Sequence, residues 1–172
     1  MTTVDVRPPQ AGLRITAASW AEIVAVVDLC GPQALAARFL GAVAPPRAEV
    51  LARLARTFDE GVTLVASVSA PVSGPVSGPA PVGLFGVHPD GARRAELCAL
   101  VADGHQGRGV GAALLAAVLA APRYRAWTLH AVVGHGNLAA HGLVRAAARQ
   151  APVTRHLFAD GVEYVLHPRG SA

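Results

Sequence analysis

The segment that most restricts the fold of this chain is a glycine-rich turn between a strand-like and a helix-like stretch. Residues 96–101 read Glu-Leu-Cys-Ala-Leu-Val, glycines follow at positions 107, 109 and 111, and residues 112–120 are all alanine, leucine or valine. Glycine lets the main chain approach a ligand closely. The start of a helix carries free N–H groups and the positive end of a dipole, which favour an anion. The sequence therefore predicts a strand, turn and helix whose turn binds a phosphate group, above all a pyrophosphate.

Length and composition place the chain among globular proteins. Its 172 residues suit one domain, and a hydrophobic content of 52% with a mean hydropathy of +0.40 argues against disorder. No apolar run is long enough to cross a bilayer, so we expect no membrane partner. The N-terminus lacks a secretion signal, and two cysteines imply no disulfide framework, which together predict a cytoplasmic location.

Charge is distributed unevenly along the chain. Every cation is arginine, and residues 104–159 hold six arginines and no acid, whereas residues 1–103 hold eight arginines and nine acids. The glycine turn thus lies in a stretch without acids, which suits an anionic ligand, although solvated arginines on helix faces would give the same pattern. Scattered arginines and only 5% aromatic residues argue against nucleic-acid binding.

Hydrophobic periodicity and turn residues predict the elements. In the first half we expect a strand at 13–17, a helix at 20–30 with a capping box of Ser19 and Glu22, a helical region at 33–58 broken at Pro45-Pro46, strands at 61–68 and 82–87, a mobile Pro/Gly/Ser loop at 70–81, and a turn at 88–91. In the second half we expect strands at 95–101 and 127–133, helices at 111–121 and 137–149, and a closing hairpin of 153–158 and 162–166.

The hexapeptide Gln106-Gly107-Arg108-Gly109-Val110-Gly111, with its preceding strand and following helix, resembles the acyl-CoA motif of the GNAT superfamily of N-acetyltransferases, Gln/Arg-x-x-Gly-x-Gly/Ala. The resemblance implies an α/β (α+β) fold with a mixed, mostly antiparallel sheet and helices on both faces. The expected element order, β-α-α-β-β-β-α-β-α-β-β, is that of the superfamily. We therefore expect a single N-acetyltransferase domain over 1–172, with its core at about 13–167.

The same resemblance implies how acetyl-CoA, as co-substrate, would bind. The main chain of Ala99, Leu100 and Val101 would bind the pantetheine arm, and residues Gln106, Gly107, Arg108, Gly109, Val110 and Gly111 would bind the pyrophosphate, with Arg108 adding charge. Asn137 matches a position that contacts the cofactor, although it could equally serve only as a helix cap. No metal is expected, because the histidines at 130, 135 and 141 lack partners at metal-ligand spacing.

The implied reaction transfers an acyl group from a thioester to an amine, which must first lose its proton. Glu96, five residues before Val101, resembles the base of the subgroup that contains bacterial protein lysine acetyltransferases. The competing interpretation is a solvated carboxylate or a salt bridge to Arg93 or Arg94. The acceptor stays open between an amine-bearing small molecule and a protein lysine, and the resemblance allows a homodimer.

Two features depart from the superfamily pattern. The position of a tyrosine that many members use as general acid holds Val144, and Ala148-Arg149 replaces a usual Gly-Phe. His141 or Tyr164 could supply the acid instead. An alternative is a non-catalytic acyl-CoA-binding regulatory or partner module.

Other chemistries are weaker. Gly107-x-Gly109-x-x-Ala112 also fits a dinucleotide fingerprint, but no acid for a ribose occurs between Asp103 and Asp160. A Walker A loop is excluded because the chain has no lysine. Cys98, in an apolar strand, is expected to be a buried small hydrophobe.

Overall fold

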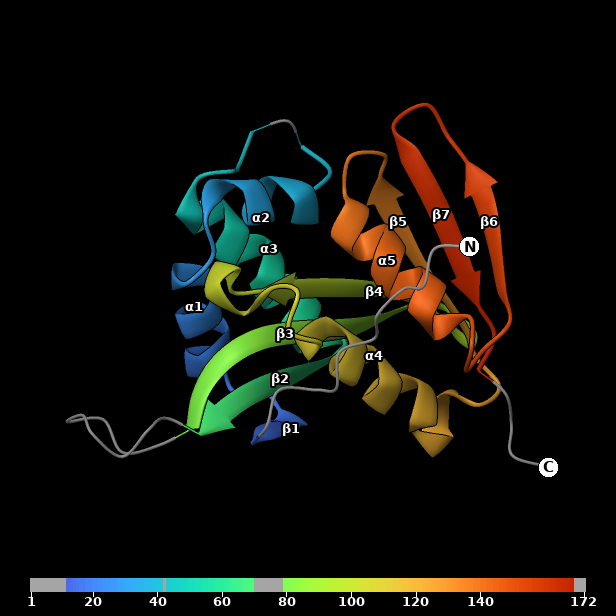
Figure 1. Ribbon diagram of the computed structural model, residues 1–172, viewed down its shortest axis with the longest axis horizontal. Helices are drawn as coiled ribbons and strands as arrows, with labels where there is room; N and C mark the ends of the chain where they lie inside the picture. The colour runs from blue at the N-terminus through green and yellow to red at the C-terminus, as the bar shows by residue number, and fades with distance from the viewer. Residues whose placement is uncertain (1–11, 42, 70–78, 169–172) are drawn as a thin grey trace.

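The computed structural model describes residues 12–41, 43–69 and 79–168. Within them the chain forms a seven-stranded sheet in the order β1-β2-β3-β4-β5-β7-β6 (Figure 1). Neighbouring strands are antiparallel except β4 and β5, which are parallel. The predicted mixed, mostly antiparallel sheet is confirmed. The strands are β1 (Leu13–Ala17), β2 (Val62–Ser69), β3 (Pro79–Gly91), β4 (Arg94–Val101), β5 (Thr128–Gly134), β6 (Val153–Leu157) and β7 (Gly161–Leu166).

Helices cover both faces of the sheet (Figure 1). One face carries α1 (Trp20–Asp28), α2 (Pro32–Arg38) and α3 (Arg47–Glu60), and the other carries α4 (Val110–Ala120) and α5 (Leu138–Ala147). Each face has its own buried cluster. The first joins Ile23, Val26, Val50 and Leu54 to Val65, Leu84 and Leu100. The second joins Val110, Leu114 and Val118 to Phe85, Val87, Leu97 and Leu129.

The two clusters also fix which way each side chain of β4 points. Successive side chains of a strand point to opposite faces. Leu100 belongs to the cluster of α1 and α3, and Leu97 belongs to the cluster of α4. Even-numbered side chains of β4, Glu96 among them, therefore lie on the α1–α3 face.

Most predicted elements are confirmed, including the capping box, in which the Ser19 N–H donates to Glu22 at 2.8 Å and the Glu22 N–H donates to Ser19 Oγ at 3.3 Å. The helical region at 33–58 is broken as expected, but the break starts before Pro45-Pro46, because α2 ends at Arg38 and α3 begins at Arg47. The observed order therefore has three helices between β1 and β2.

The predicted turn at 88–91 is wrong, and so is the start of the strand before it. Strand β3 runs from Pro79 to Gly91, with His88 paired to Glu96 and Pro89 paired to Ala95. Pairing along the whole of β4 outweighs the local turn preference of Pro-Asp-Gly, and a register shift after Pro89 accommodates Asp90. The rest of the expected mobile loop, residues 70–78, lies outside the described residues. No helix in the described part of the chain is long and apolar enough to span a membrane.

Candidate functional site

A gap opens between β4 and β5 halfway along the sheet. Their parallel pairing covers only Arg94 with Thr128, Ala95 with Leu129, and Glu96 with His130. Strand β4 nevertheless stays paired to β3 as far as Val101. Beyond Glu96, the edge of β4 that faces β5 is therefore not paired with a strand.

The direction of the main-chain groups follows from two hydrogen bonds that flank β4. The Ala102 N–H donates to Val82 O in β3 at 2.9 Å, and Arg93 O accepts from the Thr128 N–H of β5 at 2.8 Å. Since main-chain groups of alternate residues point to opposite edges, Ala99 and Val101 direct theirs into the gap. The same alternation directs the main chain of Leu100 to β3. Two of the three residues predicted for the pantetheine arm thus have the orientation that this role requires.

The glycine turn stands at the open end of this gap and leads into α4. Gly107 and Gly109 have positive φ angles, +69° and +81°, in the left-handed region that favours glycine. The Ala113 N–H donates to Gly109 O at 2.9 Å, so the N–H groups of Val110, Gly111 and Ala112 have no acceptor within the helix. Ala112 was not among the predicted residues, although it follows from the helix start at Val110.

The turn is tied to two other parts of the fold. Gln106 Nε2 donates to Val101 O at 3.1 Å and to Asp103 Oδ1 at 3.2 Å. The other carboxylate oxygen of Asp103 accepts from the Gly31 N–H at 3.1 Å, between α1 and α2. A β-carbon at Gly31 would collide with that oxygen. Gln106 therefore ties the turn to the end of β4 and to Asp103. Sequence inspection missed the role of Asp103.

Asn137 caps α5, as the sequence predicts. Its Oδ1 accepts from the Ala140 N–H at 3.0 Å. On the same helix, Leu143 lies 3.5 Å from the place of a β-carbon on Gly111, so α5 runs beside the start of α4. A contact of Asn137 with the cofactor stays a prediction. Arg108 is exposed and forms no ion pair within the described residues.

Glu96 lies where the pairing of β4 and β5 ends, with an exposed side chain on the α1–α3 face. The expected alternative of a salt bridge to Arg94 is wrong, because Arg94 lies 3.5 Å from Asp90 and 3.4 Å from Glu163. Across the described residues, Glu96 itself forms no ion pair. Its carboxylate is therefore available to a ligand.

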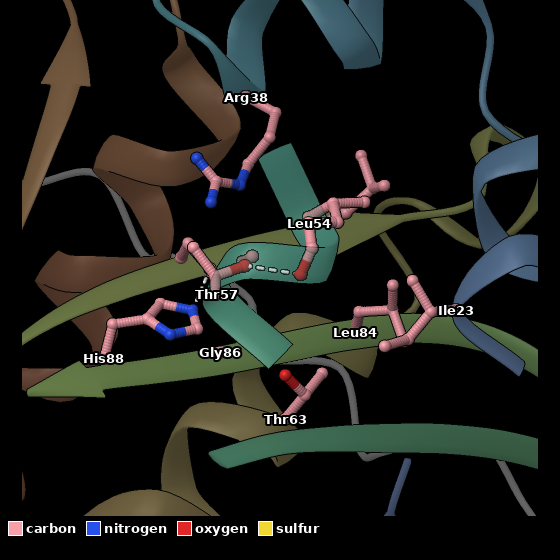
Figure 2. A pocket seen from close by; sticks show the side chains of 11 residues that line it. Ile23, Arg38, Leu54, Thr57, Thr63, Leu84, Gly86 and His88 are labelled. Atoms are coloured by element: carbon pink, nitrogen blue, oxygen red, sulfur yellow. Dashed lines mark hydrogen bonds between the residues drawn. The ribbon is translucent and has the colours of Figure 1, made fainter. Parts of the chain in front are cut away.

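A pocket lies beside Glu96 on this face, and we call it the His88 pocket (Figure 2). His88 is paired to Glu96 across β3 and β4, and its ring lies over Gly86 with Nε2 3.4 Å from Cys98 Sγ. A β-carbon at Gly86 would collide with His88 and lie 2.6 Å from Cys98 Sγ. The pocket is lined by Ile23, Arg38, Leu54, Thr57, Thr63, Leu84, Gly86, His88, Cys98, Ala99 and Leu100.

The expectation that Cys98 is only a buried hydrophobe is wrong, because its half-buried thiol contacts His88 in the wall of the pocket. The sequence did carry one signal. Gly86 and His88 alternate in the strand pattern, which puts them on the same face. A second hollow, between α4 and the strands β1 and β2, has none of the predicted site residues in its wall.

His88 is held as a neutral imidazole. Burial lowers its pKa below the usual 6.5, the charge of Arg38 lowers it further, and the charge of Glu96 partly opposes both. Its side chain has only 9% of its surface exposed. A neutral ring at this place adds no repulsion against a protonated amine that approaches Glu96.

This shift predicts a pH dependence of stability. Between pH 6.5 and the lower pKa of the folded state, the unfolded chain binds more protons at His88, so the free energy of unfolding should fall as pH falls. Urea unfolding at pH 7.5 and pH 5 should therefore show a smaller loss in His88→Gln than in the parent protein. His156→Gln, an exposed histidine, serves as control. Equal losses in His88→Gln and the parent would contradict this prediction.

The other histidines lie apart from one another. His130 Nε2 lies 2.7 Å from Asp90, His135 Nε2 lies 3.1 Å from Phe158 O, and His141 Nδ1 lies 2.8 Å from the Tyr164 hydroxyl. Among the described residues no group of three or more His, Cys, Asp or Glu side chains is suited to a metal ion.

Tyr164 has a notable position relative to the gap. It pairs with Ala131, the residue directly after the last β5 residue that pairs with β4. Its hydroxyl contacts His141 of α5, so it lies on the face opposite Glu96. Val144 is buried on the same helix.

The sheet order, the diverging β4 and β5, and the glycine turn before α4 together define the GNAT fold. Solved structures of this fold match nearly the whole chain. The GNAT domain of S. lividans PAT is 24% identical, with 90% of this chain and 89% of that chain covered and a TM-score of 0.66. A putative acetyltransferase from Salmonella typhimurium, solved with its cofactor acetyl-CoA, is 18% identical, with coverages of 90% and 92% and a TM-score of 0.62.

A more distant match is spermidine N-acetyltransferase from Vibrio cholerae, in complex with CoA and spermine. It is 13% identical, with coverages of 92% and 97% and a TM-score of 0.63. No protein-family model and no curated protein matches the chain. The similarity to solved structures thus establishes the fold, and the activity must be argued from the residues.

Proposed function

We propose that this protein is an acetyl-CoA-dependent N-acetyltransferase, which moves an acetyl group to the amine of a small molecule or of a protein lysine. The observation that carries the proposal is the divergence of β4 from β5 after Glu96, directly in front of a helix start with two left-handed glycines. This geometry joins an anion-binding turn to a slot bordered by main-chain groups of β4 that β5 does not pair. Acetyl-CoA has the matching parts, a pyrophosphate and an amide-containing arm.

Each predicted cofactor residue receives a role in this proposal. The N–H groups from Gly107 to Ala112 would bind the pyrophosphate, and the exposed Arg108 would add a positive charge. Ala99 and Val101 would hydrogen-bond the pantetheine arm from the edge of β4. Asn137 would approach the same arm from α5.

The two proton transfers of the reaction would take place on opposite faces of the sheet. Glu96, on the α1–α3 face, would take the proton of the acceptor amine, whose nitrogen then forms the new bond to the acetyl carbonyl carbon. The carbon–sulfur bond breaks, and the sulfur leaves as CoA thiolate. Tyr164, whose hydroxyl is hydrogen-bonded to His141 on the opposite face, would act as the general acid that protonates this thiolate. Attack from one face and departure from the other agree with a direct transfer.

One observation favours the second candidate, a non-catalytic acyl-CoA-binding module. Val144 is buried and has no hydroxyl at the position where many related enzymes carry a tyrosine. In that case the chain would bind acetyl-CoA without consuming it.

Calorimetry with acetyl-CoA, followed by free-thiol release in the presence of an amine panel, tests the proposal. We expect saturable binding and thiol release that depends on the acceptor. Binding without thiol release for any acceptor would favour the module. An absence of binding to both acetyl-CoA and CoA would overturn both candidates.

A further inference from the structure

Resting on the proposed function, we infer that the acceptor is a small amine that also carries a carboxylate, and that Arg38 binds this carboxylate in the His88 pocket. The starting observation is a cation without a counter-ion. Arg38 is half-buried in the wall of the pocket, and it forms no ion pair in the part of the chain that the structure describes. Figure 2 shows Arg38 and His88 on the same side of the pocket, with Ile23 and Leu84 opposite.

A neighbouring arginine makes the contrast clear. The guanidinium groups of Arg38 and Arg53 each lie 5.1 Å from the centroid of the Phe39 ring. Arg53 is neutralised by a salt bridge to Glu49, four residues earlier in α3. Arg38 has no such carboxylate partner among the residues that the structure describes, so its positive charge is available to a ligand in the pocket. An anionic group there would gain a charge-assisted hydrogen bond.

A carboxylate of opposite charge lies beside the pocket, because Glu96 pairs with His88 across β3 and β4. Arg38 lowers the pKa of His88, whereas Glu96 and, more weakly, Glu60 raise it, so the charges of all three reach this ring. The cation of Arg38 in the wall of the pocket, the carboxylate of Glu96 beside the pocket and the neutral imidazole of His88 complement an acceptor with two opposite charges. Its ammonium group would be attracted to Glu96 and its carboxylate to Arg38.

The same arrangement disfavours other acceptors. The second cation of a polyamine would meet the guanidinium of Arg38, and a lysine within a protein has no carboxylate of its own beside the amine.

The test compares amino acids of several side chains with the matching amides, by free-thiol release with acetyl-CoA. Amidation removes the carboxylate but also lowers the pKa of the amine. We therefore measure the acid-to-amide ratio, which is kcat/KM for the amino acid divided by kcat/KM for its amide, and compare this ratio between the parent protein and each variant. A hydrogen bond to a charged group is worth about 1.5–3 kcal/mol, so Arg38→Gln should lower the ratio about 10- to 100-fold.

Two further variants separate binding of the carboxylate from a structural role. Arg53→Gln removes the other guanidinium from the Phe39 ring and should leave the ratio unchanged. Arg38→Glu should shift preference from amino acids to diamines. The inference is overturned if Arg38→Gln leaves the acid-to-amide ratio of the parent protein unchanged. It is also overturned if Arg53→Gln lowers this ratio as much as Arg38→Gln does. Thiol release with an unchanged ratio would refute only the inference, whereas a lack of release with every acceptor would refute the enzymatic function as well.

Discussion

Glu96→Gln should lower kcat by about 10²- to 10⁴-fold, the usual contribution of a general base, while the dissociation constant for acetyl-CoA changes little. The reason is the position of the carboxylate on the last residue of β4 that pairs with β5, where it is exposed and forms no salt bridge to a described residue. The amide keeps the size of the side chain but cannot accept the ammonium proton. Steady-state thiol release and calorimetry with acetyl-CoA measure the two quantities separately.

A matched control for this experiment is Glu60→Gln. Glu60 ends α3 and, like Glu96, raises the pKa of His88 through its charge, but it is not on β4. If Glu96 acts as a base, Glu60→Gln should retain nearly full activity. Amines that are already deprotonated at neutral pH should also lose less rate in Glu96→Gln than alkylamines do. A similar loss in both variants, or for both kinds of amine, would contradict the role of Glu96.

Gly109→Val should weaken acetyl-CoA binding about tenfold or more. Gly109 is the N-cap of α4 with φ at +81°, a region that costs an ordinary residue roughly 1–2 kcal/mol and is worse for a β-branched one. Relief of this strain would rotate the peptide groups that lead into the helix, and their N–H groups would no longer converge on one anion. Calorimetry with acetyl-CoA and with CoA measures the loss, and circular dichroism checks the fold.

Gly104→Ala provides the comparison, because Gly104 lies in the same loop without a positive φ and with open space around its missing β-carbon. Its affinity for acetyl-CoA should stay close to that of the parent. Unchanged binding in a folded Gly109→Val protein would remove the pyrophosphate from the start of α4, and with it the basis of the proposed function.

Local patterns predicted the elements that bear on the cofactor. The apolar strand, the glycines and the alanine-rich helix are contiguous, so their geometry follows from short-range rules such as helix capping and left-handed glycine. The prediction for Leu100 shows the limit of this approach. Only the pairing of β3 with β4 reveals which alternate residues of β4 direct their main chain into the gap.

The His88 pocket could not be predicted in the same way. Arg38 ends α2, His88 lies on β3 and Cys98 lies on β4, and nothing in their sequence spacing brings them together. The Pro-Asp-Gly sequence after His88 moreover favours a turn, and only long-range strand pairing overrides that preference. The proposed acceptor side therefore depends on tertiary structure, whereas all the proposed cofactor residues except Asn137 lie in one continuous segment.

The hydrogen bonds of Asp103 give the molecule a mechanical link between its two halves. One carboxylate oxygen accepts from the Gly31 N–H in the connection before α2, and the other accepts from the side-chain amide of Gln106 before the glycine turn. If the proposed acceptor binds beside α2 and restrains that connection, it also restrains the glycine turn proposed to bind acetyl-CoA. Thermodynamic linkage then requires acceptor and acetyl-CoA to raise each other's affinity by the same factor.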